Sequence, residues 1–197
     1  MKIMAEMVKE LKNRTGVGLM DCKKALEEAG GDMDLAIERL RIIGLAKAAK
    51  KEGRQANEGV ISAYIHAGDK LGVLVELNCE TDFAARTEEF KKLAHEVALH
   101  IAAVAPDYIS EDEIPENVVE MERKIFYEQS KDLGKPKDVL DKIIEGKLKK
   151  RLSEMCLLNQ PYVRDPDKTI SDLIKEAIAK FNENIRVKRF ARFKLGE

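Results

Sequence analysis

The 197-residue sequence has no tryptophan, few aromatic residues and almost no net charge. Aromatic residues make up only 5% of the chain, so its core must be built from leucine, isoleucine, valine, alanine and methionine. The 35 lysines and arginines nearly balance the 36 aspartates and glutamates, which excludes a protein-wide field that would attract nucleic acid or membrane. Recognition of any partner must therefore come from local shape and a few side chains.

Cysteine is also scarce, and the three cysteines, Cys22, Cys79 and Cys156, are far apart and show no C-x-x-C spacing. This pattern argues against a disulfide framework and a zinc site, and it favours a reducing compartment. Glu6 and Lys9 come before any apolar stretch that could form a signal-peptide core. No apolar run approaches the roughly 18 residues of a membrane span. We expect a soluble, cytoplasmic protein with no membrane contact.

Residues 1–46 show the periodicity of three short helices separated by glycine turns. The expected helices begin near Met4, Leu19 and Asp32, and Asp32 is placed to cap the third. A basic segment with few core residues follows at 47–57, and we interpret it as a linker or an exposed helical tail.

From residue 58 onward, the hydrophobic period changes from that of helices to two. The pattern predicts strands near 60–65, 71–77 and 186–195, and helices near 87–105, 115–133, 138–144, 147–156 and 170–181. Since strands and helices are segregated rather than alternating, we expect an α+β core domain over 58–197 with a small antiparallel sheet.

The usual catalytic and metal-binding patterns are missing. His95 and His100 resemble the zinc-protease motif, but on a helix side chains five residues apart point about 140° apart, so we interpret them as two histidines at the solvent edge. The chain has no phosphate-binding G-x-x-x-x-G-K-S/T loop and no arrangement of serine, histidine and aspartate. We therefore expect no enzyme, no metal site and no cofactor.

The loop after the second strand, residues 79–86, has the sequence C-E-T-D-F-A-A-R. Neither the strand pattern before it nor the helix pattern after it gives Phe83 a place in the core. Two interpretations stay open from the pattern alone. Either Asp82 caps a helical turn and Phe83 packs under the hairpin, or Phe83 points outward as a wedge into another protein.

Several segments resemble one family in its own order. Residues 81–86 closely resemble the T-D-F-V-A-R/K signature of elongation factor Ts, and residues 8–26 are similar to that family's ubiquitin-associated-type helical domain. The stretch Q-P-Y-V at 160–163 and the ending R-F-A-R-F-K-L-G-E at 189–197 are similar to its C-terminal part. The matches extend over the chain from end to end.

The resemblance implies a non-enzymatic exchange factor with a three-helix ubiquitin-associated-like domain, a linker and an α+β core. It implies that the small domain docks on elongation factor Tu, with Leu19 and Met20 as candidate contacts. It further implies that Phe83 displaces the magnesium ion that holds GDP, with Asp82 beside it and Thr81 and Ala84 as its frame.

Two departures from the family pattern bear on this expectation. Ala84 stands where the family often has valine, so the base of the wedge is smaller. The chain is also shorter than members that have a duplicated core subdomain, which implies a homodimer, and the exposed edge of the C-terminal strand is the candidate contact.

Other function classes stay open beside the exchange factor. The protein could be a ubiquitin-associated-like adaptor whose second domain is a scaffold, or an RNA-binding protein that uses its basic C-terminal strand. A DNA-reading helix-turn-helix is disfavoured, because Glu27 and Glu28 follow Lys23 and Lys24 where they would repel phosphates. We expect no direct contact with nucleic acid.

Overall fold

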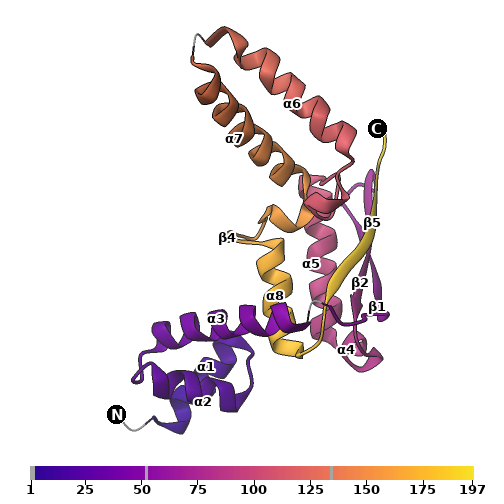
Figure 1. Cartoon of the computed structure of the whole chain (residues 1–197). Helices are drawn as coiled ribbons and strands as arrows, with labels where there is room; N and C mark the ends of the chain where they lie inside the picture. Colours follow the sequence, from indigo (N-terminus) through magenta and orange to yellow (C-terminus); the bar gives the residue numbers. More distant parts are fainter. Residues whose placement is uncertain (1–2, 52, 134) are drawn as a thin grey trace.

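The computed structural model describes residues 3–51, 53–133 and 135–197 and has three parts (Figure 1). A bundle of three N-terminal helices is joined through its last helix to an α+β core. A two-helix arm projects from the core at the end opposite to the bundle. The α+β class expected from the segregated pattern is confirmed.

The N-terminal bundle consists of α1 (Ala5–Thr15), α2 (Leu19–Glu28) and α3 (Met33–Lys51). Its core is apolar, and the buried residues are Val8, Leu11, Cys22, Ala25, Leu26, Ala29, Ala36 and Leu40. Asp32 Oδ1 accepts the N–H of Leu35 at 2.9 Å, which caps α3 as predicted. The helix continues to Lys51, through the first part of the segment expected as a linker, and Ala48 is buried against the core domain.

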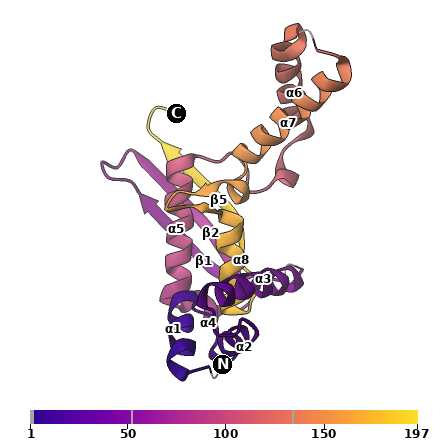
Figure 2. The same cartoon turned by 90° about the vertical axis from the view of Figure 1, so that its left-hand side faces the viewer.

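The core contains an antiparallel sheet of β1 (Glu58–Ile65), β2 (Leu71–Cys79) and β5 (Arg186–Lys194) in the order β1-β2-β5. Helices α5 (Glu88–Val104) and α8 (Ile170–Phe181) lie on one face of this sheet (Figure 2). A short pair of strands, β3 (Pro161–Tyr162) and β4 (Asp165–Thr169), leads into α8.

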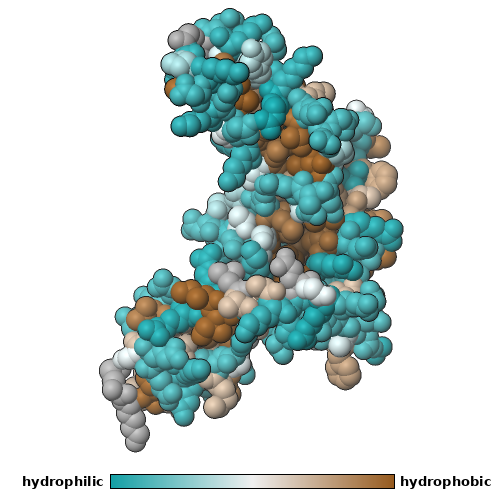
Figure 3. All heavy atoms as spheres, in the orientation of Figure 1, coloured by the Kyte–Doolittle hydropathy of each residue, from teal (hydrophilic) through white to brown (hydrophobic). Residues whose placement is uncertain are grey.

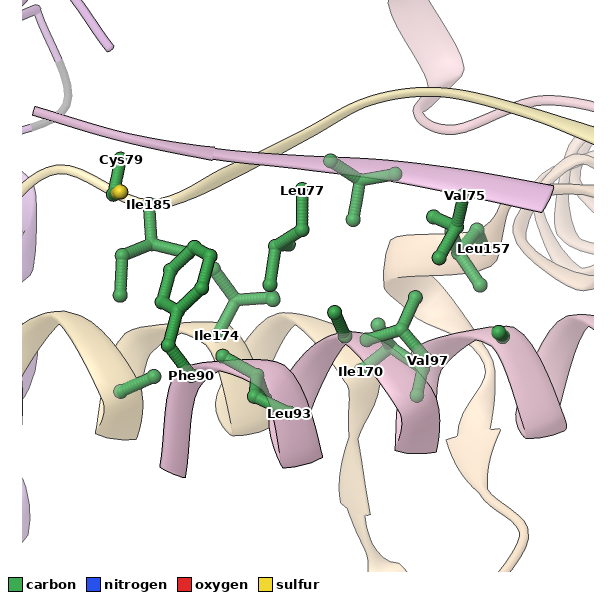
Figure 4. Packing of buried hydrophobic residues seen from close by; sticks show 14 of the residues in the cluster. Val75, Leu77, Cys79, Phe90, Leu93, Val97, Leu157, Ile170, Ile174 and Ile185 are labelled. Atoms are coloured by element: carbon green, nitrogen blue, oxygen red, sulfur yellow. The ribbon is translucent and has the colours of Figure 1, made fainter. Parts of the chain in front are cut away.

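The core is formed between the inner face of β2 and the apolar stripes of the two helices. Figure 4 shows Val75 and Leu77 pointing from the strand toward Phe90 and Val97 of α5. All four side chains are fully buried. At the end of the sheet that leads into the loop after β2, Gly59 has φ 151°, and a Cβ there would lie 2.2 Å from the carbonyl oxygen of Leu77. Only glycine therefore lets β1 approach β2 so closely.

The arm is built from α6 (Glu116–Ser130) and α7 (Lys137–Met155). Single-turn 3₁₀ helices flank them at Glu111–Glu113, Lys131–Leu133 and Leu157–Asn159. We expected two helices where α7 runs without interruption through Gly146, and that expectation was wrong. Ile144 and Leu148 on either side of the glycine are buried, and this packing outweighs the roughly 1 kcal/mol helix penalty of glycine.

His100 is fully buried, so the interpretation of two histidines at the solvent edge was wrong for this residue. Its Nε2 donates to Gln160 Oε1 at 3.0 Å, and its Nδ1 accepts the N–H of Val163 at 3.3 Å. The apolar residues of α5 give no reason to expect a buried histidine among them. Residues 160–163, which lie against the ring, supply hydrogen-bond partners for both ring nitrogens. Burial lowers the pKa of His100, because the charged ring would be removed from water.

This buried histidine predicts a loss of stability in mild acid. A lowered folded-state pKa means that the stability is present above the unfolded pKa of about 6.5 and is lost as the pH falls toward the folded value. We expect the free energy of unfolding to fall between pH 7.5 and pH 5.5, as measured by urea titration. His100→Gln should show a smaller fall over the same interval, and an equal fall would contradict the assignment.

Candidate functional site

The loop that follows β2 contains a five-residue helix, α4 (Asp82–Arg86), which is the helical turn that one of the two open interpretations placed at Asp82. Thr81 is its N-cap, with Oγ1 accepting the N–H of Ala84 at 3.4 Å. Thr87 ends it, donating its hydroxyl to the carbonyl of Ala84 at 2.8 Å and accepting the N–H of Phe90 at 3.2 Å. Threonines thus hold α4 at both ends.

Phe83 points away from this frame and is 83% exposed, the highest value among the large apolar side chains of the described residues. Its neighbours Ala84 and Ala85 are 7% and 5% exposed and pack into the core cluster. The small alanines occupy the place under the hairpin, so the interpretation that packed Phe83 there is wrong. One face of α4 is anchored, and the other presents an aromatic ring to solvent.

Asp82 is the first residue of α4, and its carboxylate lies 2.8 Å from the guanidinium of Arg86. Both side chains are exposed, so this ion pair contributes little to stability. Thr81, rather than Asp82, caps the helix. The carboxylate of Asp82 therefore lies on the surface beside Phe83.

Cys79 and Glu183 stabilise the backbone that leads into α4. The thiol of Cys79 donates to the carbonyl of Thr81 at 3.1 Å. Burial, with the nearby Glu183 carboxylate, raises the pKa of this thiol to about 11, which keeps it protonated and unreactive. Glu183 was missed by the sequence analysis. It lies 102 residues from Thr81 in the sequence, in a turn whose composition gives no sign of this contact.

The candidate docking residues of the N-terminal bundle are also exposed. Leu19 and Met20 open α2 and are 49% and 77% exposed, and neither belongs to the buried core of the bundle. Figures 1 and 2 both place α4 and the bundle at the same end of the molecule, opposite to the arm. The structure thus brings Thr81, Asp82, Phe83 and Ala84 together, and it presents Leu19 and Met20 separately on another element.

The described residues contain no group of three or more histidine, cysteine, aspartate or glutamate side chains that could hold a metal ion. In the same part of the chain, no helix combines the length and the apolar character needed to cross a membrane.

Comparison with known proteins shows to which family the chain belongs. The family model for Elongation factor TS matches residues 34–197. The chain is 56% identical to elongation factor Ts of Carboxydothermus hydrogenoformans over 99% of its own length and 90% of that relative. It is 55% identical to elongation factor Ts of Thermosipho melanesiensis over 99% of its own length and 100% of that relative. It is also 55% identical to elongation factor Ts of Fervidobacterium nodosum, over 100% of both chains. The chain belongs to the elongation factor Ts family.

Membership settles the class of activity. An elongation factor Ts is a guanine-nucleotide exchange factor of elongation factor Tu, and it is not an enzyme that makes or breaks bonds. Translation elongation takes place in the cytoplasm, where this factor acts. The relatives that the chain covers over 100% of their length are equally short, so the short form recurs among them. The adaptor and RNA-binding alternatives are thereby set aside.

Proposed function

We propose that Phe83 is the side chain with which this elongation factor Ts opens the nucleotide site of elongation factor Tu. The observation that supports the proposal is a ring 83% exposed on a helix whose other face is buried. Aromatic residues of this kind dominate the energy of protein interfaces. Asp82 lies beside the ring as a polar contact, and Thr81 and Ala84 hold the backbone in place.

In the proposed mechanism, the ring enters elongation factor Tu near the bound magnesium ion and displaces it. The GDP phosphates then lose the charge that neutralises them, and the affinity for GDP falls. By thermodynamic linkage, a factor that binds the nucleotide-free form more tightly must weaken nucleotide binding to the same extent. Each tenfold weakening needs about 1.4 kcal/mol of preferential contact, so one ordinary interface is sufficient.

Docking is assigned to the N-terminal domain, residues 1–46, with Leu19 and Met20 as contacts. Methionine and leucine at the start of α2 give an adaptable apolar surface on a rigid bundle. Residues 47–57 connect this domain to the core of 58–197, which supplies the wedge. Docking and release are thus assigned to different elements of one chain.

The protein is further proposed to form a homodimer, and the face of the sheet opposite α5 and α8 is the contact. Three rows of paired residues cross this face, and the second and third rows in the following order are apolar. They are Ile61–Glu76–Arg189, Ala63–Leu74–Ala191 and Ile65–Gly72–Phe193. Ile61, Ile65 and Phe193 are each more than 60% exposed. Figure 3 shows apolar atoms along the right-hand margin, where Figure 1 places the sheet.

A second copy suits this face better than the free edge of β5 alone does. The edge of β5 contains many lysines and arginines, a composition that discourages strand-to-strand pairing. The face instead presents the large side chains Ile61, Ile65, Leu74 and Phe193 together, and Leu195 continues it beyond the strand. A patch of this kind on a soluble chain marks an interaction site.

The first prediction concerns the wedge itself. Phe83→Ala should lower the rate of fluorescent GDP release from elongation factor Tu by about 30-fold or more, because truncating a hot-spot aromatic costs about 2 kcal/mol. The midpoint of urea unfolding should hardly change, since the ring is exposed. Normal exchange by a folded Phe83→Ala protein would refute the wedge.

The role of Asp82 can be separated from its ion pair by two variants. Asp82→Ala and Arg86→Ala both remove the same contact of 2.8 Å, and each should change the free energy of unfolding by less than about 1 kcal/mol. If Asp82 contacts elongation factor Tu, GDP release by Asp82→Ala should be several-fold slower than by Arg86→Ala. Equal rates for the two variants would show that Asp82 has no contact of its own.

The dimer contact predicts the mass in solution. The wild-type protein should have twice the mass of 22.2 kDa in sedimentation at micromolar concentration, and Phe193→Glu should sediment as a monomer, because a carboxylate in an apolar contact is costly to bury. Lys188→Glu, in the same strand outside the three rows, is the matched control and should stay dimeric. A Phe193→Glu dimer would favour the strand edge as contact, and a wild-type monomer would refute the dimer.

A further inference from the structure

The turn between α8 and β5 holds the chain just before α4 through one carboxylate. Glu183 Oε2 accepts the backbone N–H of Glu80 at 3.1 Å and that of Thr81 at 3.0 Å. Its other oxygen, Oε1, accepts the hydroxyl of Thr81 at 2.6 Å. A single side chain thus binds three donors on two consecutive residues, and these residues lead directly to Phe83.

The contact is reciprocal. Glu80 Oε1 accepts the backbone N–H of Asn184 at 2.6 Å, so each segment offers a carboxylate to the backbone of the other. The guanidinium of Arg54 lies 3.5 Å from Glu80 Oε2, and Asn184 Nδ2 donates to the carbonyl of Arg54 at 2.7 Å. We call these five residues, Arg54, Glu80, Thr81, Glu183 and Asn184, the carboxylate clasp.

The clasp also reaches the end of the N-terminal bundle. Lys51, the last residue of α3, donates from Nζ to the carbonyl of Asn182 at 2.8 Å. Asn78 Nδ2 donates to the carbonyl of Ala56 at 3.2 Å. The segment that leaves the docking domain is therefore bound to the same turn that binds the wedge loop.

We infer that Glu183 is a positioning residue for nucleotide exchange, which holds α4 and Phe83 in a fixed orientation relative to the N-terminal domain through its three hydrogen bonds to Glu80 and Thr81. The inference rests on the proposed role of Phe83. A five-residue helix is too short to be stable alone. Ordering loop residues during insertion costs conformational entropy, so a loop that is ordered beforehand loses less affinity in the transition to the open complex.

A role limited to stability fits these contacts less well. Thr81 is exposed and Glu183 is half-buried, so two of the three hydrogen bonds lie at the surface. The apolar cluster between β2, α5 and α8 does not include either side chain. Loss of the carboxylate should therefore loosen the wedge loop and leave the core folded.

The test is GDP release measured by stopped-flow fluorescence, with elongation factor Tu loaded with labelled GDP and rising concentrations of this protein. In Glu183→Ala, the maximal release rate should fall about tenfold, and the concentration for half-maximal rate should change less than about twofold, because Leu19 and Met20 are unaffected. An equal change in both parameters, or in neither, would overturn the inference. Circular dichroism and urea unfolding report on the fold.

Three further variants make the result specific. Glu183→Gln should keep most of the rate, because its carbonyl still accepts both N–H groups and its amide can donate to the Thr81 hydroxyl. Glu183→Asp should be slow, since its shorter side chain cannot reach all three donors, and it replaces Glu183→Ala should that variant fail to fold. Glu176→Ala, on α8, removes a surface ion pair of 2.9 Å with Lys168 of β4 and should exchange like wild type.

A double variant separates this inference from the wedge proposal. If Glu183 acts through Phe83, Phe83→Ala with Glu183→Ala should be no slower than Phe83→Ala alone, because residues that act as a unit are not additive. Additive losses would place the effect of Glu183 elsewhere and refute its positioning role. Normal exchange by Phe83→Ala would refute the wedge itself, and a slow Phe83→Ala beside a normal Glu183→Ala would refute only the role of Glu183.

Discussion

The packing of β2 against α5 is the contact on which the rest of the molecule depends. Val75 and Leu77 on the strand and Phe90 and Val97 on the helix exclude water from the centre of the core. Residues 80–87 connect these two elements, so fixing the strand and the helix limits where both ends of α4 can lie. With the contacts of Glu183 added to this frame, an exposed aromatic side chain can be held in place without being buried.

Such a frame allows the contacts that give affinity for elongation factor Tu to be separate from the contact that releases GDP. A wedge that provided all of the binding energy would stay in its partner after the nucleotide had left, and GTP could not rebind. Contacts made equally with both states of the partner give affinity without exchange, whereas contacts made only with the open state drive GDP out. In the proposed mechanism, Leu19 and Met20 make the first kind of contact and Phe83 makes the second. The turn between α8 and β5 joins the two, since Asn182 binds Lys51 at the end of α3 and Glu183 binds the backbone just before α4.

Hydrophobic pattern in the sequence predicted those features of the structure that contacts within one element decide. The period-two hairpin and the capped helix after Thr87 follow from burial along single elements, whereas the pattern left the exposure of Phe83 open and only the family resemblance favoured it. Tertiary contacts decided the rest: α7 passes through Gly146 because Ile144 and Leu148 beside it are buried, and His100 is buried because a distant segment satisfies its ring. Glu183 could not be predicted at all, because a contact across 102 residues leaves no periodic mark in one sequence.

The strand β2 has apolar side chains on both of its faces. A strand with one face in water alternates apolar and polar residues, but from Val73 to Val75 three consecutive side chains are apolar. Val73 and Val75 account for the inner face and α5 covers them, which leaves Leu74 and its row on the outside. Since apolar residues on both sides of a strand are typical of a sheet covered on both faces, the sequence itself favours a second layer. The described residues leave this face open, and the proposed second copy would supply the missing layer.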